Sequence, residues 1–277
     1  MEMSISEKLT YSTVLIKCKY VDGSSGSGTG FIINLCNDDE KHLCVPVVIT
    51  NNHVVQNSIE TSFEFCLAGK NGEPIDDKCQ NIIYQGNAWI HHPDESVDLC
   101  CLLLAELLTD LDKKGIKVFY VPLTTNLIPP ISDIENLCAM EDIVMIGYPI
   151  GISDLFNHKP VIRKGITATH IKKDYQGKKE FLIDMACFPG SSGSPVFLLN
   201  EGSYHMGNTL YAGSRVGFVG ILYGGPQFSA KGDIILMDLP NIPKTITHIP
   251  ANLGLAIKSQ RILEFESIFA PLLSKNQ

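Results

Sequence analysis

The stretch "FPGSSGSPVF", residues 188–197, places three serines and two glycines between Phe188 and an apolar segment typical of a strand. Dense glycine and serine usually indicates a flexible surface loop. A serine held in a tight turn can instead act as a nucleophile, provided that a base lies within hydrogen-bond reach and a third group orients that base. The remainder of the chain decides between these interpretations, and the order of the three groups along it bears on the fold.

Composition and charge exclude several classes of protein. The chain has 277 residues, of which 44% are hydrophobic and 19% charged, as in ordinary globular proteins. Its formal net charge of −8 argues against a nucleic-acid partner, since such proteins carry a basic surface. The apolar run at 100–108 is too short for a membrane span and contains Glu106. Residues 1–12 lack the features of a secretory signal, which favours a cytoplasmic protein.

The cysteines predict neither disulfides nor a metal site. There are nine, an odd number, and no CxxC pair occurs. In a reducing compartment such residues are small apolar side chains with free thiols. The adjacent Cys100 and Cys101 point to opposite faces of a predicted strand, so at least one is expected in the core. We predict no metal ion and no other cofactor.

Short β-branched segments bounded by glycine, asparagine, aspartate or proline recur along nearly the whole chain, as at 12–21, 44–52 and 215–225. This pattern predicts an all-β protein. Helical spacing is convincing only at 257–273, where Ser259 is a suitable N-cap. The proline-containing stretch 107–133 is predicted to connect two β-rich halves.

Two polar residues stand where a base and its orienting group could lie. His53, in "VVITNNHVV" (47–55), follows an apolar strand at the point where that strand gives way to a turn. Asp98 is the last charged residue before the apolar run at 99–105, so it lies at the mouth of a buried strand and must be hydrogen-bonded there. Each alone has a simpler explanation: His53 as a surface or core histidine, and Asp98 as a turn or cap residue.

The serine motif itself excludes one fold. The G-x-S-x-G elbow of α/β-hydrolases does not fit, because Ser194 stands where its last glycine belongs and the alternating helices of that fold are missing from the pattern. The stretch fits G-x-S-G-[GS]-P before a strand. In that pattern, the backbone N–H groups of the first glycine and of the serine converge to form an oxyanion hole.

Seven motifs follow one another in a familiar order: "GSGTGFII" (26–33), "ITNNHVV" (49–55), "VDLCCLLL" (97–104), "MIGYPIG" (145–151), "GITAT" (165–169), "IDMACFPGSSGSPVF" (183–197) and "GLAI" (254–257). Together they resemble the trypsin-like serine proteases of chymotrypsin fold, in particular the bacterial HtrA-type and glutamyl-endopeptidase branch. The resemblance extends from about residue 12 to residue 260.

The resemblance implies two antiparallel six-stranded β-barrels with a C-terminal helix. The whole chain, 1–277, would be one peptidase domain, with the first barrel at 7–118, the second at 119–256 and the helix at 257–273. Relatives of HtrA type usually carry a PDZ domain after the protease. None is expected here, because the chain ends after one predicted helix.

The resemblance also assigns the catalytic roles. Ser192 would be the nucleophile, His53 the general base and then acid, and Asp98 the group that orients the imidazole. The N–H groups of Gly190 and Ser192 would form the oxyanion hole, with Ser191 and Ser194 as structural neighbours. This implies a serine endopeptidase that hydrolyses proteins or peptides through an acyl-enzyme. Many relatives have an aspartate at the position of Ser191 for zymogen activation, so that switch is not expected.

Substrate specificity follows from the same comparison. The resemblance implies that the pocket is lined by two groups of residues: Ala186, Cys187 and Phe188, and Gly220, Ile221 and Leu222. Ala186 stands where trypsin-like pockets have a carboxylate, and Leu222 where glutamyl endopeptidases have a histidine, so we expect a small or medium apolar side chain at P1. Substrate backbone is expected to pair with the strand edge at 216–222.

Other interpretations remain open at this point. A protease-fold binding module that has lost turnover is one alternative, and a viral-type processing protease is another. The adjacent His91 and His92 are interpreted as an exposed turn. The long segments 200–215 and 226–252 are either a lid or docking surface, or tolerated surface insertions.

Overall fold

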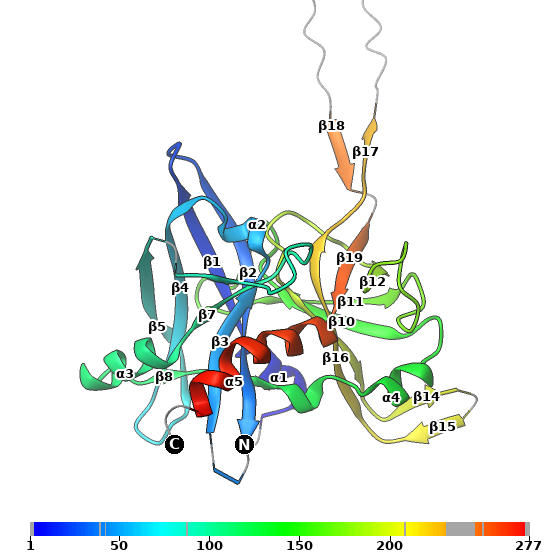
Figure 1. The fold of residues 1–277 in the computed structure, drawn as a ribbon, viewed down its shortest axis with the longest axis horizontal. Coiled ribbons are helices and arrows are strands. Elements are labelled where there is room, and N and C mark those ends of the chain that lie inside the picture. The colour runs from blue at the N-terminus through cyan, green and yellow to red at the C-terminus, as the bar shows by residue number, and fades with distance from the viewer. Residues whose placement is uncertain are drawn as a thin grey trace, which may run out of the picture.

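Two β-sheets, one in each half of the chain, make up most of the protein (Figure 1). They are seen in a computed structural model of the chain, which describes residues 3–38, 40–41, 43–86, 88–207, 209–230, 247–250 and 252–274. The all-β prediction is confirmed. Among the described residues, none of the helices is both long enough and apolar enough to span a bilayer.

The first sheet has nine strands in the order β5-β4-β1-β2-β3-β7-β6, with β8 paired to β4 and β9 to β2. Their bounds are β1 (Thr13–Tyr20), β2 (Ser25–Asp38), β3 (Leu43–Thr50), β4 (Ser58–Ala68), β5 (Pro74–Gln85), β6 (Ile90–His91), β7 (Cys100–Leu103), β8 (Val118–Phe119) and β9 (Leu123–Thr124). The predicted domain bounds stay a prediction; β8 and β9 lie at and beyond residue 118 and still pair within this sheet.

The second half forms a closed six-stranded barrel in the order β10-β11-β12-β19-β16-β13. Its strands are β10 (Asp142–Gly147), β11 (Val161–Thr167), β12 (Glu180–Asp184), β13 (Pro195–Asn200), β16 (Arg215–Gly224) and β19 (Leu253–Lys258). Two hairpins extend from it: β14 (Ser203–Met206) with β15 (Thr209–Ala212), and β17 (Gln227–Ala230) with β18 (Thr247–Pro250). They lie in segments 200–215 and 226–252; residues 208, 231–246 and 251 lie outside the described residues, so the roles suggested for these segments stay predictions.

The described helices are short. They are α1 (Ile5–Thr10), α2 (Asn52–Val55), α3 (Ala105–Lys113), α4 (Ile131–Glu135) and α5 (Glu266–Ser274), with 3₁₀ turns η1 (Thr125–Leu127), η2 (Pro149–Gly151) and η3 (Ser259–Phe265). Helix α3 overlaps the start of the predicted connection at 107–133. Three of its leucines pack on the core of the first half together with Leu104, which directly precedes the helix: Leu107, Leu108 and Leu111.

The C-terminal helix begins later than predicted. Strand β19 continues through Lys258, because residues 253–258 pair with β12 and β16. A 3₁₀ segment follows before the α-helix starts at Glu266. Ser259 does not cap the helix; it is fully buried, and its hydroxyl donates to the carbonyl oxygen of Phe218 at 2.7 Å. The helical spacing was correct, and strand pairing sets its start.

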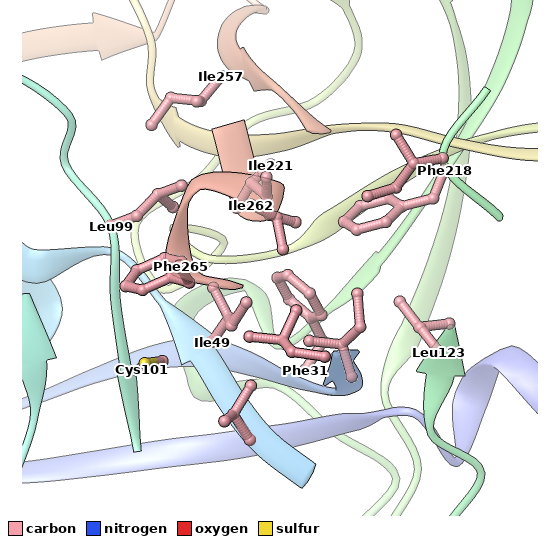
Figure 2. Packing of buried hydrophobic residues seen from close by; sticks show 14 of the residues in the cluster. Phe31, Ile49, Leu99, Cys101, Leu123, Phe218, Ile221, Ile257, Ile262 and Phe265 are labelled. Carbon is pink, nitrogen blue, oxygen red and sulfur yellow. The ribbon is translucent and has the colours of Figure 1, made fainter. Parts of the chain in front are cut away.

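A hydrophobic core joins the two halves (Figure 2). Alternate residues of β2 divide between this core and the core inside the first half, as the two faces of a strand require. Cys101 and Cys100 divide in the same way, so both are buried and the prediction for this pair is confirmed. Phe31 of β2 meets Phe218 of β16 edge to face, with ring centroids 5.2 Å apart. Residues of η3 cover this core, and Figure 1 shows the C-terminal segment lying in front of β3.

We predict that Phe218→Ala lowers the free energy of unfolding by about 3–5 kcal/mol, the usual cost of truncating a fully buried phenylalanine. The ring is 0% exposed and contacts both Phe31 and Phe197, so its removal leaves a cavity between the halves. Urea denaturation measures the change. Phe156→Ala, at a side chain that is 75% exposed, is the control and should change stability by no more than about 0.5 kcal/mol. Equal small effects would contradict a shared core.

Candidate active site

His53 and Asp98 form a closely bonded pair. His53 lies in α2, just after β3, and Asp98 lies two residues before the start of β7, which pairs with β3. The imidazole Nδ1 is 2.5 Å from Oδ2 of Asp98, and the His53 backbone N–H donates to Oδ1 at 3.0 Å. Nδ1 therefore carries the proton, which leaves Nε2 as an acceptor. The side chain of His53 is 46% exposed and that of Asp98 is 26% exposed, so the imidazole is accessible from solvent.

The stretch 188–194 forms two consecutive β-turns. The N–H of Ser191 donates to the carbonyl of Phe188 at 3.0 Å, and the N–H of Ser194 donates to the carbonyl of Ser191 at 3.0 Å. The third position of each turn is a glycine with positive φ, +84° at Gly190 and +88° at Gly193, as in type II turns. The dense glycine and serine here produces a defined backbone shape.

The turns leave two backbone donors free beside Ser192. The carbonyl of Pro189 accepts the N–H of Ile150 at 2.5 Å. Because the C=O and N–H of a trans peptide point in opposite directions, this bond turns the N–H of Gly190 away from Ile150. The bonded carbonyl of Ser191 orients the N–H of Ser192 in the same manner. Neither N–H has an acceptor within the part of the chain that the structure describes.

Thr29 of β2 connects the first sheet to these turns. Its N–H donates to the carbonyl of Ser192 at 2.8 Å, and its hydroxyl donates to the carbonyl of Gly190 at 3.1 Å. The same hydroxyl accepts the N–H of Tyr148 at 3.0 Å. A Cβ at Gly193 would collide with the carbonyl oxygen of Thr29, so that glycine is required by close approach as well as by its φ. Thr29 was not singled out from the sequence, because a threonine between strand glycines gives no signal of a contact across 160 residues.

The hydroxyl of Ser192 lies 3.5 Å from the carbonyl oxygen of Tyr223, a long contact. Tyr223 and Asp98 line one cleft of about 400 Å³. Ser192 and His53 are not among the residues that line this cleft, so only the contact with the Tyr223 carbonyl relates Ser192 to it. The hydrogen bonds among the described residues do not include one between Ser192 and His53; such bonds are often long in the free enzyme and shorten with substrate.

Ala186, Cys187 and Phe188 lead into the turns. The carbonyl of Ala186 accepts a hydrogen bond of 2.6 Å from Nη1 of Arg163, and the side chain of Phe188 is 40% exposed. Cys187 packs beside Gly254, where an added Cβ would come within 2.6 Å of its Sγ. Burial raises the pKa of the Cys187 thiol to about 11, so the thiol is neutral at physiological pH.

Gly220, Ile221 and Leu222 are enclosed within β16, with Ile221 in the core between the halves and Leu222 in the core of the barrel, which corrects their predicted place at the substrate surface. Ile221 and Leu222 are 0% and 2% exposed. Gly220 pairs with β13 on one side and with β19 on the other, and β19 also pairs with Ile221 and Leu222, so the predicted edge is already occupied at 220–222. Pairing with β13 ends at Ile221, and the strand edge therefore opens about Tyr223. A strand pattern does not reveal where its neighbour ends.

Tyr223 is a candidate site residue that the sequence interpretation did not single out within the strand 217–225. Its hydroxyl donates to Oε2 of Glu180 at 2.8 Å, which fixes the ring, and its carbonyl faces Ser192. Burial first, and then the Glu180 carboxylate, raise the pKa of the Tyr223 hydroxyl, so it stays protonated.

The loop before Asp98 is held by the C-terminal segment. His92 is buried, whereas an exposed turn was predicted for both histidines; only His91 is exposed. Nε2 of His92 donates to the carbonyl of Arg261 at 3.0 Å, and Nδ1 accepts the N–H of Asp94 at 3.0 Å. Arg261 pairs with Asp94 at 2.6 Å. Segment η3 thus fixes the start of the loop that ends at Asp98.

Comparison with known proteins gives the family. Residues 28–204 match the model of the trypsin-like peptidase domain. The chain belongs to this family. No curated protein matches it. Identities to the solved structures below are under 25%, so these show the fold alone, which is chymotrypsin-like.

Three solved structures illustrate the likeness. The HtrA-type protease AlgW with a tripeptide is 17% identical, with a TM-score of 0.50 over 94% of this trypsin-like chain and 60% of its own. The chain thus spans less than two thirds of that protein. The thermostable serine protease AL20 from an extremophilic microorganism is 15% identical, with a TM-score of 0.49. The match covers 94% of this chain and 99% of the AL20 chain. The active form of the Rv3671c protease from M. tuberculosis is 15% identical, with a TM-score of 0.45. The match covers 94% of this chain and 80% of the Rv3671c chain.

We predict that Thr29→Val lowers the free energy of unfolding by about 1–3 kcal/mol, because it removes the acceptor of the buried Tyr148 N–H. Valine keeps the shape of threonine, so the hydroxyl alone is tested. Urea denaturation gives the stability, and faster hydrogen exchange at the Tyr148 amide would locate the effect. Thr209→Val, on the exposed strand β15, is the control. Unchanged stability and exchange in Thr29→Val would contradict the contact.

Proposed function

We propose that this trypsin-like peptidase is a serine endopeptidase with Ser192 as nucleophile, His53 as general base and acid, and Asp98 as the group that orients His53. The observation that carries the proposal is the pair of free N–H donors, from Gly190 and Ser192, beside the Ser192 hydroxyl. A peptide carbonyl held by both donors would have its carbon next to the Ser192 oxygen. The two hydrogen bonds from His53 to Asp98, one from the backbone N–H and one from Nδ1, support the same roles.

In the proposed mechanism, Nε2 of His53 takes the Ser192 proton as the hydroxyl oxygen bonds to the substrate carbonyl carbon. The carbonyl electrons move to oxygen, where the Gly190 and Ser192 N–H groups stabilise the charge; one such donor contributes roughly 3 kcal/mol. The imidazolium returns the proton to the leaving amine, which breaks the peptide bond and leaves an acyl-enzyme. Water, deprotonated by His53, then bonds to the acyl carbon; the bond to the Ser192 oxygen breaks, and the imidazolium returns the proton to that oxygen as the acid leaves. Asp98 stays ionised and stabilises the imidazolium.

Substrate backbone would pair with the open edge that begins at Tyr223 and continues into Gly224 and Gly225. Main-chain bonding of this kind accepts many sequences and requires an extended segment. We propose that the P1 pocket takes small or medium apolar side chains. Support comes from Ala186, from the neutral thiol of Cys187 and from its neighbour Gly254, none of which offers a charge to the substrate.

A fluorophosphonate probe distinguishes the three serines of the opening turn. We expect labelling of the wild type and its complete loss in Ser192→Ala. Ser191→Ala and Ser194→Ala are matched controls that should still be labelled, because both hydroxyls are buried and have no partner among the described residues. An unlabelled wild type, or equal loss in the Ser191→Ala control, would contradict the proposal; the former would favour the binding-module alternative.

Digestion of a peptide library measures the P1 preference. We expect most cleavage after alanine, valine or residues of similar size, and little after charged residues. Cleavage mainly after lysine, arginine or glutamate would contradict the proposed pocket. A strong preference for acidic P1 residues would point to Arg163, whose Nε and Nη2 are buried without a partner among the described residues.

A further inference from the structure

Three potential metal ligands meet at a place away from the proposed catalytic residues. Glu64 comes from β4, Cys79 from β5 and His158 from the loop before β11, and each is half-buried. One ligand atom from each lies within 4.8 Å of the other two. Oε2 of Glu64 is 3.2 Å from Nδ1 of His158 and 3.7 Å from Sγ of Cys79.

These separations fit a tetrahedral site. Zinc binds nitrogen and oxygen ligands at about 2.0–2.1 Å and thiolate sulfur at about 2.3 Å. At tetrahedral angles, those bond lengths place N and O about 3.3 Å apart and S and O about 3.5 Å apart. Imidazole, thiolate and carboxylate are also the ligand types that zinc takes in proteins.

The ligands are positioned by the backbone before any ion binds. Glu64 is opposite Asn81 in the antiparallel pair of β4 and β5, so Cys79, two residues along, shares the face of Glu64. Nζ of Lys17 donates to Oε1 of Glu64 at 3.0 Å, which leaves Oε2 directed at the other two ligands. Such a hydrogen bond to the second oxygen is how carboxylate ligands are usually oriented.

The loop that carries His158 is fixed as well. His158 has a φ of +52°, an uncommon conformation for a histidine. The next residue, Lys159, pairs with Asp76 of β5 at 2.7 Å and lies over the ring of Tyr11, 3.3 Å from its centroid. The loop is therefore attached to the same strand that carries Cys79.

We propose that Glu64, Cys79 and His158 bind a zinc-class divalent cation, with the fourth position open to water. Binding would release the thiol proton of Cys79 to solvent. An ion pair between Glu64 and His158 would explain the approach of these two residues. It would not explain why Cys79 joins them, because a neutral thiol is only a weak hydrogen-bond donor. The proposal departs from the expectation, based on the sequence, that the protein holds no metal.

Metal binding would tie two parts of the protein together. It would link the loop at 152–160 to strands β4 and β5 of the first sheet. Two residues before this loop, the N–H of Ile150 donates a hydrogen bond to the carbonyl of Pro189. An effect of the metal on catalysis rests on the proposed function, whereas metal binding does not.

Cobalt(II) and zinc(II) test the site in the 277-residue chain. The protein is freed of metal with a chelator under reducing conditions, because Cys66 lies opposite Cys79 in the ladder and a disulfide between them would remove the thiolate. We expect one equivalent of cobalt to give the visible bands of a tetrahedral ion and a thiolate charge-transfer band. Zinc should displace the cobalt, and competition with a chromogenic chelator gives its affinity.

Three variants remove one ligand each: Glu64→Gln, Cys79→Ser and His158→Asn. Asparagine suits the left-handed backbone at 158, so this change spares the loop. Each should weaken zinc binding at least about tenfold, since even loss of a ligand's hydrogen-bond partner costs 10–100-fold. Cys79→Ser should also lose the charge-transfer band. Cys44→Ser and His91→Gln, at exposed positions, are the controls and should bind like the wild type.

Absence of one-equivalent binding, or binding unchanged in all three variants, would overturn the metal site. Thermal unfolding by circular dichroism confirms that each variant is folded; if Cys79→Ser is not, the loss of cobalt bands in His158→Asn decides. Fluorophosphonate labelling is measured in parallel. Zinc binding without any labelling would contradict the proposed function but support the metal site. Labelling without zinc binding would contradict the metal site but support the proposed function.

Discussion

The hydrogen bonds of Thr29 fix the backbone on which the candidate site depends. Turns rich in glycine have many conformations of similar energy, and ordering them is costly in entropy. Here the carbonyls of Gly190 and Ser192 are both held by one buried threonine from the other half of the chain. Thr50 in turn donates to the Thr29 carbonyl at 2.7 Å, which fixes the threonine's own backbone. Two sheets are therefore needed to give one turn its shape.

The core between the halves makes this contact possible. Thr29 and Phe31 are two residues apart on β2 and therefore lie on the same face of the strand. Phe31 packs against Phe218 of the barrel. A shift of one half relative to the other would separate Thr29 from the turn and open the aromatic contact at the same time. Packing and hydrogen bonding therefore favour the same relative position of the halves. Agreement between these two kinds of interaction favours a single folded structure. Segment η3 adds a further contact through Arg261, which pairs with Asp94 before Asp98.

Features of the sequence with a local signature were predictable, and features set by pairing were not. The strands, the serine turn and the positions of His53 and Asp98 each have a recognisable pattern of neighbours. Helix α3 also had one, since its leucines follow helical spacing, but the prolines further along the connection obscured it. The misplacement of Gly220–Leu222 has a different cause. Whether a strand residue is buried or lies at an open edge depends on where the neighbouring strand ends, and β13 ends its pairing at Ile221.

The segment from Tyr148 to Lys159 shows how the two proposed sites are related physically. Ile150 and His158 both have a φ of +52°, which costs of order 1–3 kcal/mol for residues with a side chain. Such conformations persist only where contacts hold them. At Ile150 the contact is the bond to the Pro189 carbonyl, and at His158 it is the approach to Glu64. Loss of either contact lets that end of the segment relax. A cation bound by His158 would favour the held state of the loop, and the peptide before Gly190 depends on the other end of that segment for its orientation.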